Sequence, residues 1–380
     1  MPSEPEGGGA PSGNDDGSAP AGPTIILVRL GARGDVVFTS PLVGAIRRRH
    51  PGARIVWVVE PAAADLIRHH PLLDRVVVWP RGLWAGALKG GRLPTLTREV
   101  REFAATLREE RADLAVDLHG LLRSAAVARL TGAREVVGLG AREGSALLVD
   151  RVIPRDGGDT TRISSEYLHL ASELRWDTDD FHCEVHPGPA HRAGADAHRA
   201  RLDLSEPYAV LAPFTTRPQK HWREERWAPL ALRVREEVGL RPVLLGGPDD
   251  REAAGRIAAA AALVPPRHFG VGPLVDLVGD TSLGEAAALV QGASLVVGVD
   301  TGLTHLGVAM DRPVVALFGS TLPYTHAPGR RVRVLHEPLD CSPCRTRPTC
   351  GGAFTCMAML DVDRVAQAAL GVVRGGRGFV

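Results

Sequence analysis

Short runs of apolar residues alternate with longer segments of mixed character along most of the chain. The run TIILVRL (24–30) is continuous, which is typical of a strand buried on both faces in a parallel sheet. Apolar positions recur with helical spacing in the segment that follows, and a second apolar run covers 54–60. This order predicts a strand–helix–strand unit with parallel strands. The same pattern predicts further strands over 74–80, 113–118, 135–139, 207–213, 241–247, 294–300 and 313–320, and a short one over 276–280.

The alternation falls into two series of similar length, which predicts an α/β protein with two Rossmann-like parallel-sheet domains facing a cleft. A stretch punctuated by Pro and Gly (181–191) is interpreted as the connection between them. The predicted boundaries are 24–188 for the first domain and 189–360 for the second. Residues 1–23 are Gly, Pro, Ser, Ala and acidic residues without periodicity and predict a disordered tail. Residues 361–380 contain a predicted final helix.

Composition excludes several classes of protein. The 380 residues include 45 Lys and Arg against 44 Asp and Glu, a net charge of +1, so a strongly basic nucleic-acid binder is not expected. No apolar run approaches the ~18–20 residues that a membrane span requires. The N-terminal segment lacks the basic and apolar parts of a secretory signal. The sequence therefore predicts a soluble, cytoplasmic protein without a transmembrane segment.

The loop GARGD joins the first predicted strand to its helix. Gly31 and Gly34 allow a close backbone approach and a positive φ. Asp35 then stands at the helix start, where it is either an N-cap residue or a carboxylate at the carboxyl end of a strand, suited to act as a general base. The loop is not GxGxxG, which weakens a dinucleotide-binding interpretation.

Two loops of the second series are candidate anion-binding sites. The segment FTTRPQKHW (214–222) combines two hydroxyls with basic and aromatic side chains, and it is either a phosphate site or an ordinary polar loop. In VDTGLTHLG (299–307) a buried strand ends at Asp300, and Thr301 and Gly302 open a helix whose backbone N–H groups can cradle a diphosphate. Like charges repel, so Asp300 suits a sugar hydroxyl or a cap better than a phosphate.

These segments, together with LLGGPDDRE (244–252) and the continuation of the last loop to residue 321, resemble glycosyltransferase family 9, the bacterial ADP-heptose:lipopolysaccharide heptosyltransferases. The likeness runs in order from about residue 24 to about 326. The TTRxxKHW and DTGLTHL forms are most similar to heptosyltransferase I, which adds the first heptose to Kdo. The resemblance implies the GT-B fold and an inverting transfer from ADP-heptose to Kdo-lipid A, with no catalytic metal or cofactor.

By motif position, the resemblance implies a role for each candidate residue. Asp35 matches the catalytic base, and Lys220 binds the donor's diphosphate and takes part in catalysis. Thr281 occupies the adenine-contacting place, and Asp250 stands near the ribose as a shorter carboxylate than the family's usual Glu. The other donor-binding positions are Thr215, Thr216, Asp300, Thr301, Gly302 and His305.

The acceptor side of the predicted cleft is basic, with Arg81, Lys89, Arg123 and Arg142 in loops that follow strands. Such groups suit Kdo carboxylates and lipid A phosphates, Arg in bidentate fashion. The alternative for each is a solvated surface charge.

Four of the five cysteines fall in CSPCRTRPTCGGAFTC (341–356). The spacing predicts either a structural Zn or Fe site formed by Cys341, Cys344, Cys350 and Cys356, or reduced, unligated thiols. In GT-B proteins the last helix commonly packs back on the first domain, so the same is expected of the helix after this loop.

The favoured hypothesis is a heptosyltransferase of the lipopolysaccharide inner core, peripheral on the inner face of the inner membrane through its acceptor. One alternative is a family-9 enzyme that uses another sugar or a protein acceptor. A second is a non-catalytic protein that binds a sugar nucleotide.

Overall fold

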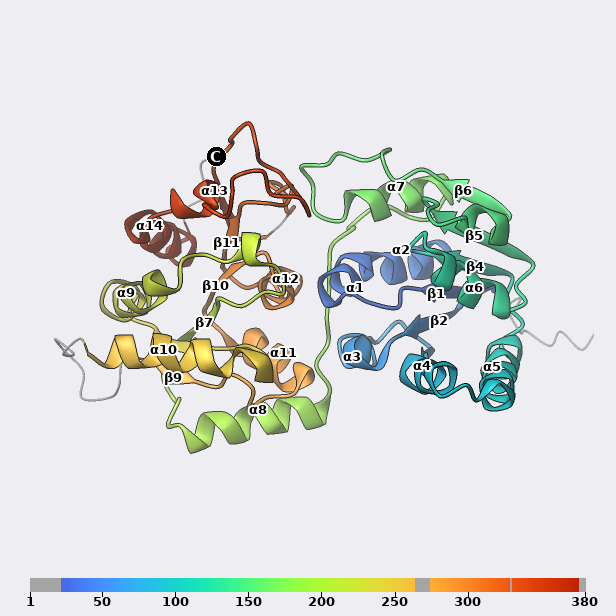
Figure 1. The fold of residues 1–380 in the computed structure, drawn as a ribbon, viewed down its shortest axis with the longest axis horizontal. Helices are drawn as coiled ribbons and strands as arrows, with labels where there is room; N and C mark the ends of the chain where they lie inside the picture. The colour runs from blue at the N-terminus through green and yellow to red at the C-terminus, as the bar shows by residue number, and fades with distance from the viewer. Residues whose placement is uncertain (1–21, 264–273, 329, 376–380) are drawn as a thin grey trace, which may run out of the picture.

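Two parallel six-stranded sheets with helices on both faces form two domains, seen side by side in the computed structural model (Figure 1). The structure describes residues 22–263, 274–328 and 330–375. The disordered tail expected over 1–23 lies almost entirely outside them. In the first sheet the order is β3-β2-β1-β4-β5-β6, with strands at Thr24–Val28, Arg54–Val59, Arg75–Val78, Leu114–Asp117, Glu135–Leu139 and Arg151–Ile153 for β1 to β6.

The second sheet repeats this topology, with the order β12-β11-β10-β7-β8-β9. Its strands β7 to β12 are Tyr208–Ala212, Arg241–Leu244, Val275–Asp276, Leu295–Val299, Val314–Phe318 and Val332–His336. In each sheet the first strand of the series lies between the second and the fourth, so the strand order reverses there. Ligands of open parallel sheets bind at that reversal, beyond the carboxyl ends of the strands.

Helices cover both faces of each sheet (Figure 1). Those of the first domain, α1 to α7, are Arg33–Thr39, Pro41–Arg49, Pro61–Ala64, Arg81–Lys89, Leu93–Arg108, Leu122–Leu130 and Ser165–Glu173. Those of the second, α8 to α14, are Pro189–Arg201, Trp227–Arg233, Arg251–Ala262, Leu283–Gly292, Gly302–Ala309, Thr355–Ala358 and Val362–Val373.

The strands form where the apolar runs predict them because a strand buried on both faces requires apolar side chains at every position. All five residues of β7, β10 and β11 are buried. One cluster of buried side chains continues from the first sheet through α1 and α12 into the second sheet. The two domains therefore share a packed contact at α1 and α12.

The segment after α7 crosses between the domains without regular structure over 181–188 and leads into α8, which packs on α11 (Figure 1). The stretch 161–163 also touches the second domain, since the Ile163 N–H donates to the His326 carbonyl and the His326 N–H to the Thr161 carbonyl. These contacts hold the two sheets with the carboxyl ends of β1 and β10 toward each other.

Some expectations need correction. The final helix, expected against the first domain, packs instead on its own domain as α14, against α9, β11 and β12. Residues 81–93, expected as a loop, contain α4. The short edge strands β6 and β12 were not predicted, because charged residues interrupt their apolar character. No helix in the described part of the chain combines the length and the apolar character needed to cross a bilayer.

Candidate active site

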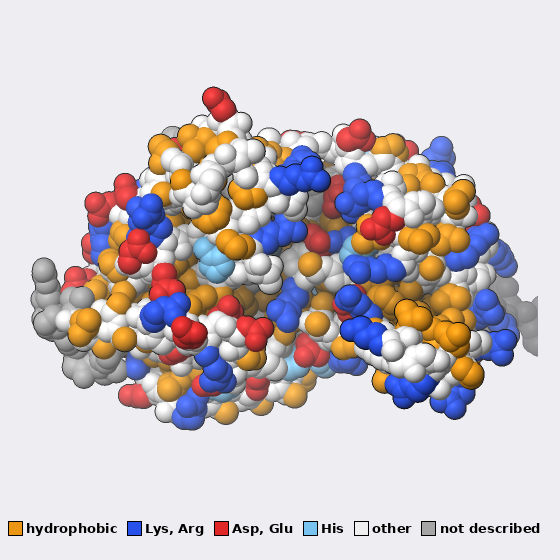
Figure 2. Space-filling view, in the orientation of Figure 1, with side chains coloured by type: hydrophobic (Ala, Val, Ile, Leu, Met, Phe, Trp, Pro, Cys, Tyr) orange, Lys and Arg blue, Asp and Glu red, His pale blue; other side chains and the backbone are white. Residues whose placement is uncertain are grey.

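The candidate site lies where the two strand-order reversals face each other, between the start of α1 and the start of α12. The space-filling view shows a furrow between the domains, with basic side chains on both sides (Figure 2). A methyl group built on Gly302 would lie 3.4 Å from the Cβ of Arg33, so the two helix starts are close neighbours. Helix starts carry partial positive charge and unpaired N–H groups, which suits an anionic ligand.

Asp35 lies in the first turn of α1 and is not its N-cap, which is Ala32. The N-cap alternative is therefore wrong. The Asp35 side chain remains 45% exposed, and its carboxylate forms an ion pair with the buried guanidinium of Arg29, directly after β1. Arg29 also donates to the Leu118 carbonyl at 2.6 Å. Arg29, at the end of β1, thus fixes one side of the carboxylate and leaves the other side open.

The guanidinium of Arg29 stays charged in spite of its burial. Burial by itself lowers the pKa of Arg29, but Tyr167, Asp35 and Glu166 outweigh it and raise the pKa above its ordinary value. A permanently charged partner held in one position keeps the orientation of the Asp35 carboxylate fixed.

Gly34 allows α1 to approach α12. A Cβ at this position would lie only 3.0 Å from Cδ2 of His305, so the close approach expected of Gly34 is confirmed. Neither Gly31 nor Gly34 adopts the positive φ that a glycine allows. The ring of Phe38, one turn further along α1, packs on the His305 ring with centroids 4.5 Å apart.

Asp300, directly after β10, is the centre of a polar network in the second domain. Its Oδ2 lies 2.5 Å from Nζ of Lys220 and accepts a 2.5 Å hydrogen bond from Thr321, and its Oδ1 lies 3.0 Å from Nε2 of His305. Burial alone would raise the pKa of the Asp300 carboxyl. The hydrogen bond and charge of His305, with the charge of Lys220, hold that pKa well below its usual range. Asp300 is therefore a carboxylate whose partners come from three separate segments.

His305 is buried, and both of its ring nitrogens have protein partners. Since a carboxylate only accepts, Nε2 donates to Asp300, while Nδ1 lies 3.0 Å from the Tyr324 hydroxyl. A hydroxyl can donate or accept, so it matches either protonation state of Nδ1. This geometry makes His305 a residue that positions Asp300.

The remaining donor-side residues occupy the loops that follow β7, β8, β9 and β10. Thr215 and Thr216 follow β7, half-buried and exposed respectively, and the Thr215 carbonyl is bonded to His221. Thr301 is the N-cap of α12 and makes no side-chain capping bond. Asp250 instead caps locally, accepting from the Gly247 N–H at 2.8 Å.

Thr281 lies in the loop after β9, which runs beside the Asp250 loop. The Gly279 N–H donates to the Gly246 carbonyl at 3.1 Å, which joins the two loops. Thr281 and Asp250 thus lie in adjacent loops, which follow β9 and β8 at one edge of the second sheet.

On the acceptor side, Arg123 and Arg142 are exposed and converge on His119, at the carboxyl end of β4. Burial first, and then the charges of Arg29, Arg123, Arg155 and Arg142, lower the pKa of His119 to about 3. Its Nδ1 is buried without a hydrogen-bond partner in the described chain. A neutral imidazole therefore lies among cations. Arg81 stands apart from this group and pairs with Glu60 at 3.2 Å.

The comparisons with known proteins agree with this geometry. The family model described as glycosyltransferase family 9 (heptosyltransferase) matches residues 100–353. A lipopolysaccharide heptosyltransferase 1 from Pseudomonas aeruginosa is 32% identical over 343 residues, which cover 86% of this chain and 87% of the relative. The chain belongs to glycosyltransferase family 9.

Solved structures of family 9 share the fold. A glycosyltransferase family 9 structure from Veillonella parvula superposes with a TM-score of 0.77 at 20% identity and covers 93% of this chain and 97% of its own. The E. coli heptosyltransferase WaaC, solved with ADP-2-deoxy-2-fluoro heptose, gives a TM-score of 0.66 at 27% identity and covers 90% and 98%. The expected GT-B fold is confirmed, and the protein is a glycosyltransferase.

The motifs of family 9 identified both partners of the Lys220–Asp300 pair, but only Asp35 of the Arg29–Asp35 pair. Arg29, His119 and Tyr324 were missed, because the sequence does not show that these side chains turn toward the site. A buried Arg at the end of an apolar strand is a signal that could have identified Arg29, since such a charge needs a partner.

The Cys-rich loop does not form a ligand set as it stands. Among the described residues, no three of its sulfur atoms come within 4.8 Å of one another, whereas thiolates around one tetrahedral Zn lie about 3.8 Å apart. The four thiols are nevertheless neighbours: burial first, then Cys344, Cys341 and Cys350, raise the pKa of Cys356. The metal site stays a prediction.

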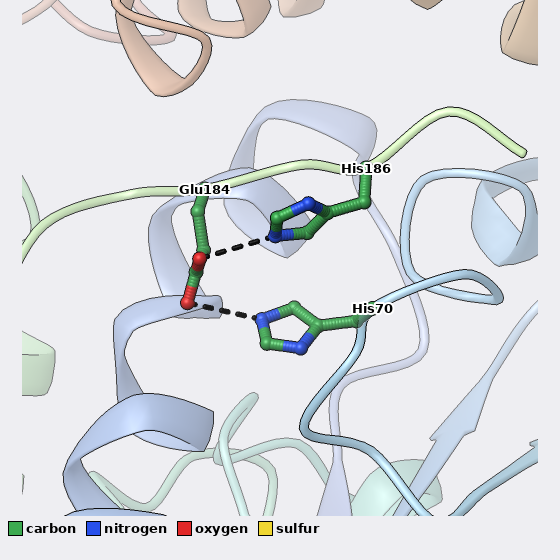
Figure 3. A group of neighbouring side chains, drawn as sticks. All are labelled: His70, Glu184 and His186. Atoms are coloured by element: carbon green, nitrogen blue, oxygen red, sulfur yellow. Dashed lines mark hydrogen bonds and ion pairs between the residues drawn. The ribbon is translucent and has the colours of Figure 1, made fainter.

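Another group, His70, Glu184 and His186, has the composition of a metal site but is better explained otherwise (Figure 3). Glu184 contacts Nε2 of both histidines, at 3.2 and 3.1 Å. The Leu72 N–H donates to Nδ1 of His70 at 3.2 Å, so the ring proton of neutral His70 is on Nε2. A metal there would move the proton to Nδ1, against the Leu72 N–H. We interpret the group as a clasp that holds the crossing segment to the first domain.

Proposed function

We propose that this protein transfers heptose from ADP-heptose to Kdo of the lipopolysaccharide inner core, with inversion at the anomeric carbon. One observation carries the proposal. Asp35 on the first domain faces Lys220 and the start of α12 on the second domain. A half-exposed carboxylate and a cationic, N–H-rich helix start face each other across one furrow. This arrangement suits a base and a leaving-group site.

In the proposed reaction, Asp35 takes the proton of an acceptor hydroxyl as its oxygen bonds to the anomeric carbon. The bond from that carbon to the diphosphate oxygen breaks on the opposite face, and ADP leaves with the electron pair. Lys220 and the N–H groups at Thr301 and Gly302 stabilise the charge that develops on the diphosphate, a term of roughly 3–4 kcal/mol for a single well-placed donor. His305 keeps Asp300 in place beside Lys220.

The donor's other contacts are assigned from the loops around this site. Thr215 and Thr216 bind the diphosphate, and Asp250 and Thr281 lie toward the nucleoside. Asp250 already caps its own loop, so its ribose contact uses the oxygen that does not accept from Gly247.

Acceptor recognition is assigned to Arg123 and Arg142, which have no ion pair within the described residues, with Arg81 near the edge. Free guanidinium groups suit carboxylates and phosphates. The acceptor places the enzyme at the inner face of the inner membrane.

The Cys-rich loop takes no part in this chemistry. It packs under the donor loop, where Nε2 of Gln219 donates to the Arg345 carbonyl at 3.0 Å. A Zn or Fe ion held by the four thiolates would order this loop and would be structural.

Mass-spectrometric assay with ADP-heptose and Kdo2-lipid A, with and without EDTA, tests the proposal. Heptose transfer to the lipid that persists in EDTA supports it. Transfer only to another acceptor, or from another sugar nucleotide, would favour a different family-9 activity. Binding of ADP-heptose without turnover would leave a sugar-nucleotide-binding protein.

A further inference from the structure

The helix α4 is apolar or small around its whole circumference, yet it lies on the surface. Its sequence, RGLWAGALK, has charged residues only at its two ends, Arg81 and Lys89. Of its nine residues, only Ala87 is buried and only Trp84 is half-buried. A helix without a polar face is normally covered on all sides, so the open surface of α4 calls for a partner.

The side of α4 that faces the protein is small and aromatic. Trp84 packs edge-on against Trp79 and Phe103, with ring centroids 5.6 and 5.5 Å away. These contacts fix α4 on the first domain, so its exposed leucines are held at the surface.

Three exposed leucines extend the apolar surface into the start of α5. Leu83, Leu88 and Leu93 are 63%, 61% and 58% exposed. Figure 2 shows hydrophobic side chains gathered over α4 and α5, with Lys and Arg around them. We call Leu83, Leu88 and Leu93 with Lys89 and Arg92 the α4 face.

Basic side chains predominate around the α4 face, although Arg81 pairs with Glu60 and Arg98 with Glu102. Residues 81–98 include four basic side chains (Arg81, Lys89, Arg92, Arg98) and no acidic one. A groove of about 560 Å³ continues the face along α5, lined by Leu93, Pro94, Thr97, Arg98, Arg101 and Glu102. Leucines within a basic surround match a surface that offers acyl chains beneath anionic headgroups.

We propose that the α4 face is a docking surface for an anionic lipid bilayer. The leucines enter the boundary between headgroups and acyl chains, and Lys89 and Arg92 contact lipid phosphates. The inference deepens the proposed function, on which it rests for the lipid acceptor. Because α4 begins at the carboxyl end of β3, the docked face is on the rim of the acceptor-side domain, next to Arg81.

A second copy of the chain fits this face less well than a bilayer does. Docking α4 on α4 about a two-fold axis would bring Lys89 and Arg92 of each copy against the same two residues of the other, whereas the other two basic side chains of 81–98 already have acidic partners. Like charges in such contact oppose association.

Flotation of the full-length protein with vesicles tests the proposal. Vesicles of phosphatidylethanolamine with phosphatidylglycerol are compared with vesicles of phosphatidylcholine, all without lipid A. We expect binding to the anionic vesicles that weakens as salt rises, and a loss of at least about tenfold in L83E/L88E. Arg92→Glu should weaken binding and flatten its salt dependence. The matched control is Leu263→Glu, which changes an 84% exposed leucine of the second domain and should bind like wild type.

Two further measurements keep the outcomes separate. L83E/L88E should keep the wild-type melting temperature and the wild-type activity on a water-soluble Kdo acceptor. Wild-type protein that does not float with anionic vesicles, or L83E/L88E that floats equally well, overturns the proposal. A wild-type dimer that L83E/L88E converts to monomer, without vesicle binding, assigns the face to a second copy instead. Vesicle binding without any heptose transfer would refute the proposed function and leave the docking surface standing.

Discussion

At the scale of single residues, each domain contributes one cation–carboxylate pair to the candidate site. Arg29 holds Asp35, and Lys220 holds Asp300. The two pairs differ in access, since Asp35 is 45% exposed and Asp300 only 11%. The exposed carboxylate is placed to exchange a proton with a substrate, and the enclosed one is placed to orient a cation.

Replacing Asp35 by Asn should remove the proposed base and keep the shape of the site. We expect turnover at least ~10²-fold lower, with donor affinity within a few-fold of wild type, because the carboxylate acts on the acceptor. Single-turnover rates and calorimetry with ADP measure the two quantities. Asp340→Asn, at an exposed position, is the control, and unchanged turnover in Asp35→Asn would contradict the role.

Lys220→Ala should weaken ADP binding by about 1.5–3 kcal/mol, the usual range for a hydrogen bond to a charged group. The loss includes the effect on Asp300, which keeps only Thr321 and His305 as partners. Lys89 is the only other lysine in the sequence, so Lys89→Ala is a matched control. Equal ADP affinity in both variants, by calorimetry, would refute the assignment.

At the scale of elements, the apolar runs were predictable because burial on both faces leaves little choice of residue. The helix α4 was not predictable, because Gly82, Gly86 and Gly90 are typical of a loop. The edge strand β12 includes Arg333, which a buried strand would not tolerate. Asp35, Lys220 and Asp300 were identified because their spacing within a loop is local. Arg29, which pairs with Asp35, and Tyr324, which bonds to His305, were not identified, because the sequence does not show which side chains turn toward each other.

Gly34→Ala tests the contact between α1 and α12. The added methyl group would lie 3.0 Å from His305, so the helices must separate by a few tenths of an ångström. We expect kcat/KM to fall by about tenfold, because transfer depends on the alignment of the two sides. Gly255→Ala is the control, since a methyl group there meets nothing within 4 Å. A steady-state assay that gives equal rates would show that the contact does not position the site.

The Cys-rich loop is tested by Cys341→Ser together with elemental analysis. If the four thiolates hold a metal, wild type contains roughly one Zn or Fe per chain, and the variant loses metal and melting temperature together but retains residual transferase activity. If wild type contains no metal and melts at the same temperature as the variant, the four cysteines are ordinary thiols without a bound metal. Complete loss of turnover in folded variant protein would contradict a purely structural role.

At the scale of the whole molecule, the clasp at Glu184 ties the crossing segment to the first domain. Burial alone would raise the pKa of Glu184, but the hydrogen bonds that it accepts from His186 and His70 lower that pKa well below the usual value. The Glu184 N–H also donates to Ser40 at 2.9 Å. A lowered folded-state pKa means that the carboxylate stabilises the fold above its unfolded pKa, and that this stabilisation disappears as the pH falls toward the folded pKa.

Glu184→Gln should therefore lower the free energy of unfolding by about 1.5–3 kcal/mol near pH 6. The difference from wild type should shrink below about pH 4, where the unfolded carboxyl is protonated. Urea unfolding at several pH values measures it. Glu236→Gln, at an exposed position, should show no such difference, and a Glu184→Gln effect that is constant down to pH 3 would contradict the clasp.

The repeated strand order gives each half of the molecule a complete sheet and its own wall of the furrow. The sequences of the two halves can therefore change independently, provided that Phe38 still packs on His305 where the halves meet. A chimera joined in the crossing segment, with the first half of one relative and the second half of another, would take its acceptor from one parent and its nucleotide sugar from the other. In this architecture, a new specificity needs no redesign of the whole enzyme, only an exchange of one half.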